Sequence, residues 1–274
     1  MIDAGAAGTP PARDVEIGGR VLRLTNLDRV LWPRTGFTKG DMIAYYRSVA
    51  DRVVEYVRDR PLTLGRFPTG VEGRGWAQTE CRGAPAWMTT ADVRLRTGHL
   101  RHYCVVNDEA SLVWVANQGV IELHPFLWRT TEPDRATEVV FDLDPGPDVG
   151  VEEACAVALR VREHLAAHDL DAWAKTTGAL GLHVHAPLER GADFDATKGL
   201  ARDVAASLTR EDPTAITDRM TRSLRTGKVF IDWAQNDRRR SLIAPWSLRA
   251  TPVPAAATPM SWAEVVARAR GEWV

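Results

Sequence analysis

The sequence predicts an α+β fold in which antiparallel strands are flanked by helices. Apolar residues recur at helical spacing in four segments, and shorter apolar or alternating segments are typical of strands. Several strand segments follow one another across a short turn, which favours antiparallel pairing over a doubly wound parallel sheet. With 274 residues, the chain is long enough to bury a full core. We expect one compact domain with two portions.

The first portion is expected to span residues 15–136, after a disordered tail at 1–14 that is rich in Pro, Gly and small residues. Val15 to Leu24 alternates around two glycines and predicts a hairpin. Thr38 can cap a helix over 39–58. Strands are expected at 61–66, 91–96 and 101–106, followed by an apolar segment at 112–121.

The second portion is expected to span residues 137–274 and to carry the larger sheet. Its helices are predicted at 151–168, 196–210 and 261–270, the last capped by Ser261. Its strands are predicted at 138–143, 171–176, 182–187, 228–234 and 241–246.

Composition excludes several protein classes. The chain is 45% hydrophobic and 26% charged, which is typical of globular proteins. No apolar run approaches the roughly 20 residues of a membrane span, and the first residues lack a basic-then-apolar signal, so a cytoplasmic protein is expected. The cysteines, Cys81, Cys104 and Cys155, are odd in number and lack CxxC spacing. Neither a disulfide framework nor a cysteine zinc site is therefore expected.

Charge is unevenly distributed. The net charge is −1, yet residues 219–249 carry eight Lys or Arg against two Asp. A basic patch of this kind suits contacts with phosphates, although a solvated surface balanced by acids elsewhere is an equally simple interpretation.

The most informative motif is an apolar strand that ends in two carboxylates, Asp142 and Asp144, before Pro145-Gly146. Residues at i and i+2 of a strand project to the same side, so the two carboxylates repel unless a cation lies between them. Hard divalent ions prefer such oxygen ligands. The motif indicates a Mg²⁺ or Mn²⁺ site; the alternative is a solvated, Asp-rich turn.

A third carboxylate, Asp232, ends another apolar run. If its strand lies beside that of Asp142, the three acids could hold two cations about 4 Å apart, which is the arrangement used for in-line phosphoryl displacement. An ordinary acid at a strand end is the alternative. Between these strands, Thr176-Thr177 and a glycine turn offer donors for anions, and His183 and His185 share one strand face. Arg249 follows an apolar run and could pair with a triphosphate.

Together these motifs resemble the polymerase domain of bacterial ligase D, which belongs to the archaeo-eukaryotic primase superfamily. The motifs are Phe-Asp-Leu-Asp-Pro-Gly (141–146), Thr-Gly-x-x-Gly-Leu-His-Val (177–184), Val-Phe-Ile-Asp-Trp-x-Gln-Asn (229–236) and Ala-Pro-Trp-Ser-Leu-Arg (244–249). The similarity covers nearly all of residues 20–265. It implies a primase-type core with a modified RNA-recognition-like sheet.

The resemblance also implies a function. Proteins like this are template-directed DNA/RNA polymerases that extend primers or fill gaps at DNA ends, favour ribonucleotides, and use two Mn²⁺ or Mg²⁺ ions with a nucleoside triphosphate. We therefore expect a stand-alone, nucleoid-associated bacterial nucleotidyltransferase of non-homologous end joining. Its partners would be DNA with a primer-template, gap or 5′-phosphorylated end, together with Ku and a DNA ligase.

Residue roles follow from the resemblance by position. The carboxylates Asp142, Asp144 and Asp232 would be the catalytic metal ligands. Nucleotide-binding positions would be Thr177, Gly181, His183, Arg225, Gln235 and Arg249, with His124 near the site. DNA-binding positions would be Arg29 and Lys39, on the 5′-phosphate, and Trp76.

Five positions depart from the family pattern, the first being Thr177, which replaces a serine. Leu180 replaces a lysine, which removes a charge-assisted contact of about 1.5–3 kcal/mol. Gly65 and Thr79 replace basic residues. Ala77 leaves Trp76 as a single stacking ring, where each stacked base contributes about 1–3 kcal/mol. We expect intact carboxylates with a weaker hold on nucleotide and template.

Two other functions were weighed. A haloacid dehalogenase-type phosphatase also uses Asp-x-Asp, but that fold needs a later Asp-Asp pair, and no such dipeptide occurs in this chain. A DNA-end-binding relative with weak or lost synthesis remains the alternative, because of the lysine lost at Leu180 and the single ring at Trp76.

Overall fold

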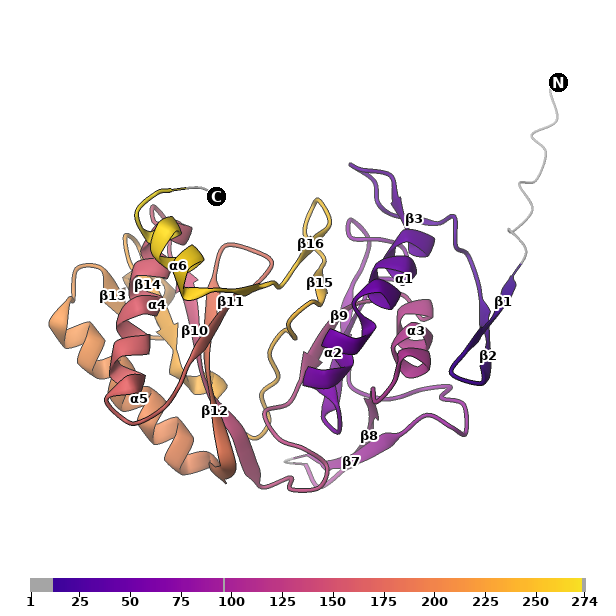
Figure 1. The fold of residues 1–274 in the computed structure, drawn as a ribbon, viewed down its shortest axis with the longest axis horizontal. Coiled ribbons are helices and arrows are strands. Elements are labelled where there is room, and N and C mark those ends of the chain that lie inside the picture. The colour runs from indigo at the N-terminus through magenta and orange to yellow at the C-terminus, as the bar shows by residue number, and fades with distance from the viewer. Residues whose placement is uncertain (1–11, 96, 273–274) are drawn as a thin grey trace.

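The structure is a computed structural model, and it describes residues 12–95 and 97–272. Two halves lie side by side along the long axis, each with a sheet and its own helices (Figure 1). The architecture is the expected α+β fold.

The N-terminal half contains three helices, α1 (Lys39–Ser48), α2 (Ala50–Val57) and α3 (Glu109–Asn117). Its strands are β1 (Arg13–Ile17), β2 (Arg20–Leu24), β3 (Val30–Trp32), β4 (Phe37–Thr38), β5 (Pro61–Arg66), β6 (Trp76–Gln78), β7 (Thr90–Arg94), β8 (Leu100–Val105) and β9 (Val120–Pro125). The pairs β1–β2 and β3–β4 are separate hairpins. The main sheet has the order β6-β5-β8-β7, with β9 also paired to β5.

The second half contains α4 (Val151–Ala166), α5 (Phe194–Glu211) and α6 (Trp262–Ala269), and the short 3₁₀ turns Arg222–Leu224 and Trp233–Gln235. Its strands are β10 (Arg135–Pro145), β11 (Trp173–Thr176), β12 (Leu182–Asp193), β13 (Ile216–Thr217), β14 (Val229–Asp232), β15 (Leu248–Arg249), β16 (Ala255–Ala256) and β17 (Pro259–Met260). The six-stranded sheet has the order β13-β14-β10-β12-β11-β17, and only β13 and β14 run parallel.

Along β10, side chains point alternately into the hydrophobic core and toward the candidate site. Val139, Phe141 and Leu143 are fully buried in a cluster with residues of α4 and α5. Asp142 and Asp144 therefore project from the opposite face of the sheet, since successive side chains of a strand point to opposite sides. That face is turned toward the N-terminal half (Figure 1).

The end of the chain ties the halves together. Ala244 and Leu248 are buried in the core of the N-terminal half. The Tyr46 hydroxyl accepts the Leu248 N–H at 3.1 Å, and the Ser247 hydroxyl accepts the Leu123 N–H at 2.9 Å. The segment that carries Arg249 is thus built into the first half.

Several predicted elements differ in detail. The helix expected over 39–58 begins at Lys39, capped by Thr38 as predicted, but it breaks at Val49 into α1 and α2. The segment 112–121 is the end of α3 followed by β9. The strand expected at 241–246 is reduced to an isolated bridge between Ser241 and Phe126, and the segment ends at Trp246, which has a left-handed backbone (φ 64°) after Pro245. Residues 13 and 14, expected in the tail, lie in β1; residues 1–11 lie outside the described residues.

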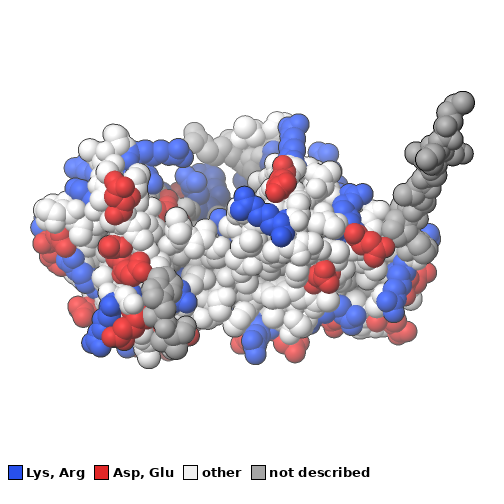
Figure 2. Space-filling model, turned by 90° about the horizontal axis from the view of Figure 1, so that it is seen from above, with Lys and Arg blue, Asp and Glu red and all other residues white. Residues whose placement is uncertain are grey.

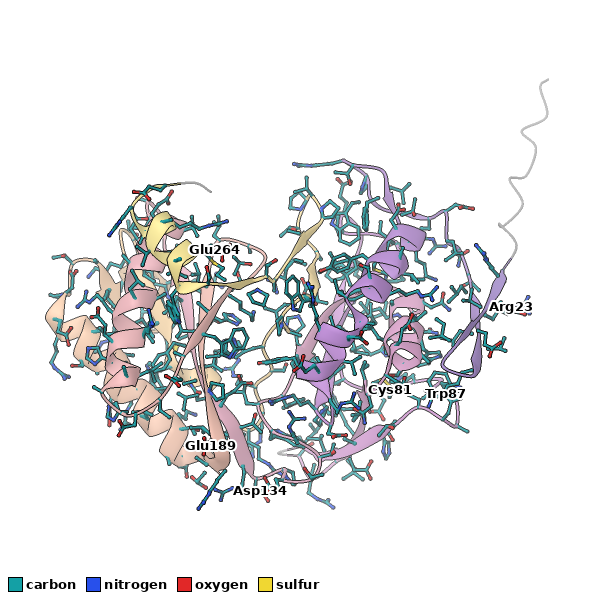
Figure 3. All side chains as sticks on the ribbon, in the orientation of Figure 1. Arg23, Cys81, Trp87, Asp134, Glu189 and Glu264 are labelled. Atoms are coloured by element: carbon teal, nitrogen blue, oxygen red, sulfur yellow. A yellow bond between two sulfur atoms is a disulfide. The ribbon has the colours of Figure 1, made fainter. Side chains whose placement is uncertain are left out.

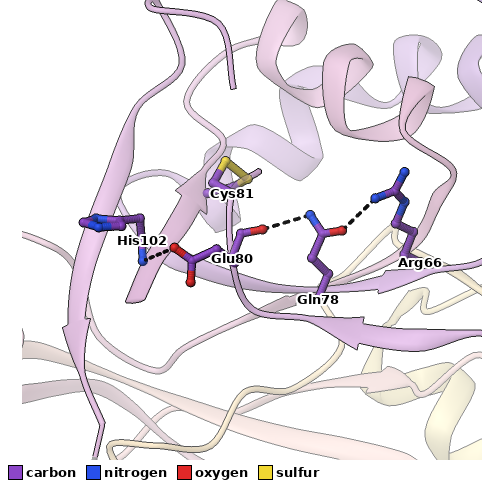
Figure 4. Close-up of a disulfide and its surroundings, with 6 residues drawn as sticks. Arg66, Gln78, Glu80, Cys81 and His102 are labelled. Carbon is purple, nitrogen blue, oxygen red and sulfur yellow. Dashed lines mark hydrogen bonds between the residues drawn. A yellow bond between two sulfur atoms is a disulfide. The ribbon is translucent and has the colours of Figure 1, made fainter. Parts of the chain in front are cut away.

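A disulfide joins Cys81 to Cys104, so the expectation that no disulfide occurs is wrong (Figure 4). The two residues are 23 apart in sequence, and the bond ties the segment after β6 to β8. Antiparallel pairing brings distant cysteines together, which a spacing pattern does not reveal. Cys81 lies in the N-terminal half, on the side of Trp87 (Figure 3).

Within the ranges described, no helix is both long and apolar enough to cross a membrane.

Candidate active site and nucleic-acid interface

Strand register brings the three predicted carboxylates to one place. Asp142 is the cross-strand partner of Asp232 on β14 and of His183 on β12. Directly paired residues project to the same face of a sheet. Asp144, two residues along β10, lies on that face as well.

Neighbouring side-chain and backbone groups contact the carboxylate oxygens of Asp142 and Asp232. The Gln235 amide donates to Asp142 Oδ2 (3.3 Å) and to Asp232 Oδ2 (3.0 Å). His183 Nε2 lies 3.1 Å from Asp142 Oδ1, and the Ala234 N–H donates to Asp232 Oδ1. In the described part of the chain, no three His, Cys, Asp or Glu side chains are arranged to hold a metal ion. The donor chemistry still fits a hard divalent cation, because three carboxylates share one face.

Electrostatics supports that fit. Burial raises the pKa of Asp142 and of Asp232 above the ordinary aspartate value. Burial, and then the charges of Asp142 and Asp232, raise the pKa of Asp144. Mutual repulsion of this kind is relieved by a bound cation. His183 is held neutral, because burial and the nearby charge of Lys175 place its pKa well below the usual histidine value.

A cavity of about 370 Å³ opens beside the acids. It is lined by His124, Asp142, Asp144, Pro145, Thr177, Ala179, Leu180, Gly181, His183, Gln235, Ser241, Leu242, Ile243 and Arg249. Five of the six predicted nucleotide-binding residues therefore lie around one space. Arg225 does not line it; its guanidinium sits 3.6 Å from the ring centre of Phe230 and donates to the Met220 carbonyl. Asp232 does not line it either and is linked to it through Gln235.

The glycine turn after β11 makes room for Arg249. Gly178 has φ +73°, and a Cβ there would lie 2.5 Å from Arg249 Cγ. The Thr177 hydroxyl donates to the Gly181 carbonyl and accepts the Ala179 N–H, which fixes the turn. The turn and the arginine therefore pack directly against each other.

On its other side, Arg249 faces Glu122, which pairs with His124, the histidine expected near the site. Its Nε lies 3.5 Å from Glu122 Oε1, and Glu122 Oε2 lies 2.9 Å from His124 Nε2. Arg249 Nε and His183 Nδ1 are buried without a hydrogen-bond partner among the described residues. The Arg249 guanidinium, which stays charged and lines the cavity, is suited to an anionic ligand.

Lys175 also lies in the candidate site, although it was not among the site residues predicted from the sequence. It is fully buried and is the cross-strand partner of His183, so Lys175, His183, Asp142 and Asp232 form one row across four strands. Burial lowers the pKa of Lys175 to about 7, against the opposing effect of Asp142. A lysine in an otherwise apolar strand just before the Thr176-Thr177 turn was the only signal in the sequence.

The predicted 5′-phosphate residues line a second cavity, of about 230 Å³, between β3, α1 and the end of α3. It brings Arg29 and Lys39 together with Arg66. The Lys39 ammonium donates to the Thr25 carbonyl (2.6 Å) and to Asn117 Oδ1 (2.8 Å). Burial, and then the charges of Arg29 and Arg66, lower the pKa of Lys39 to about 8.

Trp76 is 43% exposed, with the Arg66 guanidinium 5.5 Å from its ring centre. It lines a mostly apolar cavity of about 400 Å³ that shares His124 and Ser241 with the space beside the acids. An exposed indole next to that space is placed where a base could stack. In the view from above, basic side chains gather in the recess between the halves (Figure 2).

A cavity larger than the one beside the acids lies elsewhere. It measures about 830 Å³, is found between α2 and the strands β11 and β12, and contains none of the predicted site residues. Its charged lining is balanced, with Arg52, Arg60, Arg129 and Arg190 facing Glu55, Glu132, Glu138 and Glu189. Size alone therefore does not identify the functional site.

A family model and proteins of known function match most of this chain. The family described as LigD, primase-polymerase domain, matches residues 38–273. The multifunctional non-homologous end joining protein LigD of Mycolicibacterium smegmatis is 38% identical over 247 residues, which cover 89% of this chain and 32% of that protein. The bifunctional LigD of Bacillus subtilis is 26% identical over 246 residues, covering 89% and 39%. The chain spans about a third of the length of these relatives.

A solved structure also matches. It is the polymerase domain from Mycobacterium tuberculosis ligase D in complex with DNA, with a TM-score of 0.87 and 38% identity. The match covers 90% of this chain and 89% of that one.

Proposed function

The chain belongs to the LigD primase-polymerase domain family, a family of nucleotidyltransferases, and we propose that it is a template-directed polymerase acting at DNA ends. In this proposal it extends primers or fills gaps, favours ribonucleotides, and serves non-homologous end joining with Ku and a DNA ligase. The observation that carries the proposal is the convergence of Asp142, Asp144 and Asp232 beside a cavity that Arg249 and His183 also border.

The three carboxylates would hold two Mn²⁺ or Mg²⁺ ions. When bound, such ions lower the pKa of a primer 3′-hydroxyl and stabilise the charge of a leaving pyrophosphate. Gln235, which now bridges two of the acids, would keep them at a fixed separation.

The chain's own residues would orient the nucleotide. The Arg249 guanidinium would pair with the triphosphate, the neutral His183 would border it beside Asp142, and Thr177 with Gly181 would shape the turn that faces it. Bidentate pairing of a guanidinium with phosphate is strong and directional. The 3′-oxygen of the primer would attack the α-phosphorus, forming a phosphodiester bond as the bond to pyrophosphate breaks. Arg225, which lies near Asp144, would act on the acids rather than on the nucleotide.

DNA would be held away from the reacting atoms. Lys39 and Arg29 would receive a 5′-phosphate in their cavity, and Trp76 would stack on a template base. Both contacts position a gap or an end without reading its sequence.

A primer-extension assay with Mn²⁺ and ribonucleotides tests the proposal. Asp142→Asn together with Asp144→Asn should reduce extension by at least about 100-fold, because two ligands lose their charge. Asp148→Asn is the matched control: Asp148 is exposed in the loop that follows, its backbone is left-handed, and asparagine tolerates that conformation. Extension that survives the double substitution would overturn the polymerase assignment.

Leu180 favours a second candidate, a DNA-end-binding protein with weak or lost synthesis. Its side chain is 70% exposed at the mouth of the cavity, where the family pattern has a lysine. Tight binding of 5′-phosphorylated DNA by a protein that shows no extension with either metal would support this candidate. Stimulation of extension by Leu180→Lys would instead support a polymerase with a weakened nucleotide site.

A further inference from the structure

A further cationic cavity lies beside Trp76 and shares Arg66 with the cavity that holds Lys39. It measures about 440 Å³ and is lined by Arg66, Arg82, Arg101 and other residues of the β6 segment. Its acidic lining residue is Glu80, one oxygen of which accepts the backbone N–H of His102. The cavity thus carries an excess of positive charge.

The guanidiniums are held by neutral acceptors. Arg66 donates to the Gln118 carbonyl at 2.7 Å and to Gln78 Oε1 at 3.0 Å, and Arg101 donates to the Thr79 hydroxyl. Among the residues the structure describes, neither Arg66, Arg82 nor Arg101 forms an ion pair with a carboxylate. Their charges therefore remain available to an anion from outside the chain.

The disulfide fixes the spacing of two of these arginines. Cys81 directly precedes Arg82, and Cys104 lies on β8, the strand that carries Arg101. The Cys81 N–H also donates to the His102 carbonyl at 2.7 Å. Figure 4 shows the bond beside the chain of contacts that runs from Glu80 through Gln78 to Arg66. The segments that carry Arg82 and Arg101 are thus covalently joined.

Arg66 connects this cavity to the one that holds Lys39, because it lines both. The Lys39 cavity has no acidic lining residue. Together the two cavities make a continuous series of cations, Arg29, Lys39, Arg66, Arg101 and Arg82. Several cations that line adjoining cavities are suited to contact more than one phosphate of a nucleic-acid strand.

Arg101 also accounts for a departure from the family pattern. Thr79 stands where that pattern has a basic residue, and the Arg101 guanidinium, coming from the neighbouring strand, bonds to the Thr79 side chain. The positive charge is present near position 79, although it comes from another part of the chain.

We propose that Arg66, Arg82 and Arg101 form a second phosphate-binding site, which holds backbone phosphates of the DNA template strand next to Trp76. This site adjoins the 5′-phosphate cavity, with which it shares Arg66, and has no residue in common with the cavity beside the acids. The proposal rests on the proposed function, since it assumes that the protein binds DNA ends.

The test is DNA binding by fluorescence anisotropy between 50 and 200 mM salt, on a duplex with a single-stranded template overhang. Arg82→Gln with Arg101→Gln should lower affinity by about 10-fold or more at low salt. It should also reduce the slope of log affinity against log salt by about 1.5, because each phosphate contact contributes about 0.7–0.9. Arg23→Gln with Arg94→Gln removes the same charge from exposed positions on β2, where Figure 3 shows Arg23, and on β7, and should change neither quantity.

Two further arms keep the result interpretable. Arg101→Lys keeps the charge without the guanidinium bond to Thr79, so it should retain most of the salt slope if phosphate binding is the role. The preference for a 5′-phosphate over a 5′-hydroxyl end should survive Arg82→Gln with Arg101→Gln, and should be lost in Lys39→Met.

The outcomes separate the two proposals. A double variant with the same affinity and salt slope as the Arg23/Arg94 control overturns the second site and leaves the proposed function standing. Loss of the 5′-phosphate preference in the double variant overturns the separation of the two sites. An unsubstituted protein that binds no DNA overturns the proposed function itself.

Discussion

Gln235 holds two carboxylates together with one amide. Because its Nε2 donates to both Asp142 and Asp232, it offsets a repulsion that would otherwise separate them.

Replacing this amide should weaken cation binding. We expect Gln235→Leu to lower Mn²⁺ affinity by about 10-fold, since one lost hydrogen bond to a charged group costs about 1.5 kcal/mol or more. Electron paramagnetic resonance of free Mn²⁺ measures this without a nucleotide. Unchanged affinity would show that the amide does not set the spacing of the acids.

The charge of Lys39 should make end recognition depend on pH. The pKa of Lys39 is lowered to about 8, first by burial and then by the charges of Arg29 and Arg66. The Lys39 side chain is therefore protonated and charged below that pH, and it loses its charge above it. The ratio of affinities for 5′-phosphate and 5′-hydroxyl DNA should therefore fall between pH 7 and pH 9. Lys39→Arg keeps its charge over this range and should give a nearly constant ratio. A pH-dependent ratio in Lys39→Arg would assign the effect to another group.

Gly65 illustrates how packing can forbid a family residue. A Cβ at Gly65 would lie 2.7 Å from the Cβ of Glu122, on the neighbouring strand β9. Any side chain there would displace Glu122, which holds His124 and faces Arg249. The absence of a basic residue at this position is therefore a consequence of the local packing.

At the scale of elements, the disulfide joins the β6 segment to the main sheet of the N-terminal half. Trp76, Arg66 and Arg101 all line the cavity at this junction. The Cys81–Cys104 bond thus stabilises this edge of the sheet and also holds in place the residues proposed to contact DNA.

Removing the disulfide should lower the affinity for DNA more than the affinity for nucleotide. Cys81→Ser with Cys104→Ser is expected to lower the free energy of unfolding by about 3 kcal/mol, the scale for a loop of this length. DNA affinity should fall because Arg82 and Arg101 lose their fixed spacing, whereas nucleotide affinity should change little. Denaturant unfolding and anisotropy measure the two effects. Cys155→Ala, at a buried free cysteine, is the control for cysteine loss. Equal losses of nucleotide and DNA affinity would contradict a local role.

At the scale of the whole molecule, the two halves share their cores. Leu248 and Ala244 belong in sequence to the second half but are buried in the first, and Arg249 is carried into the cavity by the same segment. The candidate site therefore depends on both halves, although all three acids come from one sheet.

A fragment of residues 137–274 is expected not to fold on its own. Its segment around Leu248 would expose apolar side chains and lose the hydrogen bonds to Tyr46 and Leu123. A heteronuclear NMR spectrum of the fragment should lack the dispersion of a folded protein, whereas the full chain should show it. A well-dispersed spectrum of the fragment would identify two independent domains.

The sequence by itself determined much of this protein. It gave the α+β class, the hairpin of β1 and β2, the capped helices α1 and α6, and the order of motifs that identified the family, because these depend on local periodicity and on residue types at fixed spacing. Strand alternation also predicted that Asp142 and Asp144 share a face.

Only the tertiary structure decided which distant residues meet. The register of β10 with β12 and β14 placed Lys175, His183, Asp142 and Asp232 in one row, and the packing of β5 against β9 placed Glu122 beside Gly65. The same holds for the Cys81–Cys104 bond and for Arg101 beside Thr79. Pairing between strands far apart in sequence is set by the competition of many long-range contacts, so no local pattern records it.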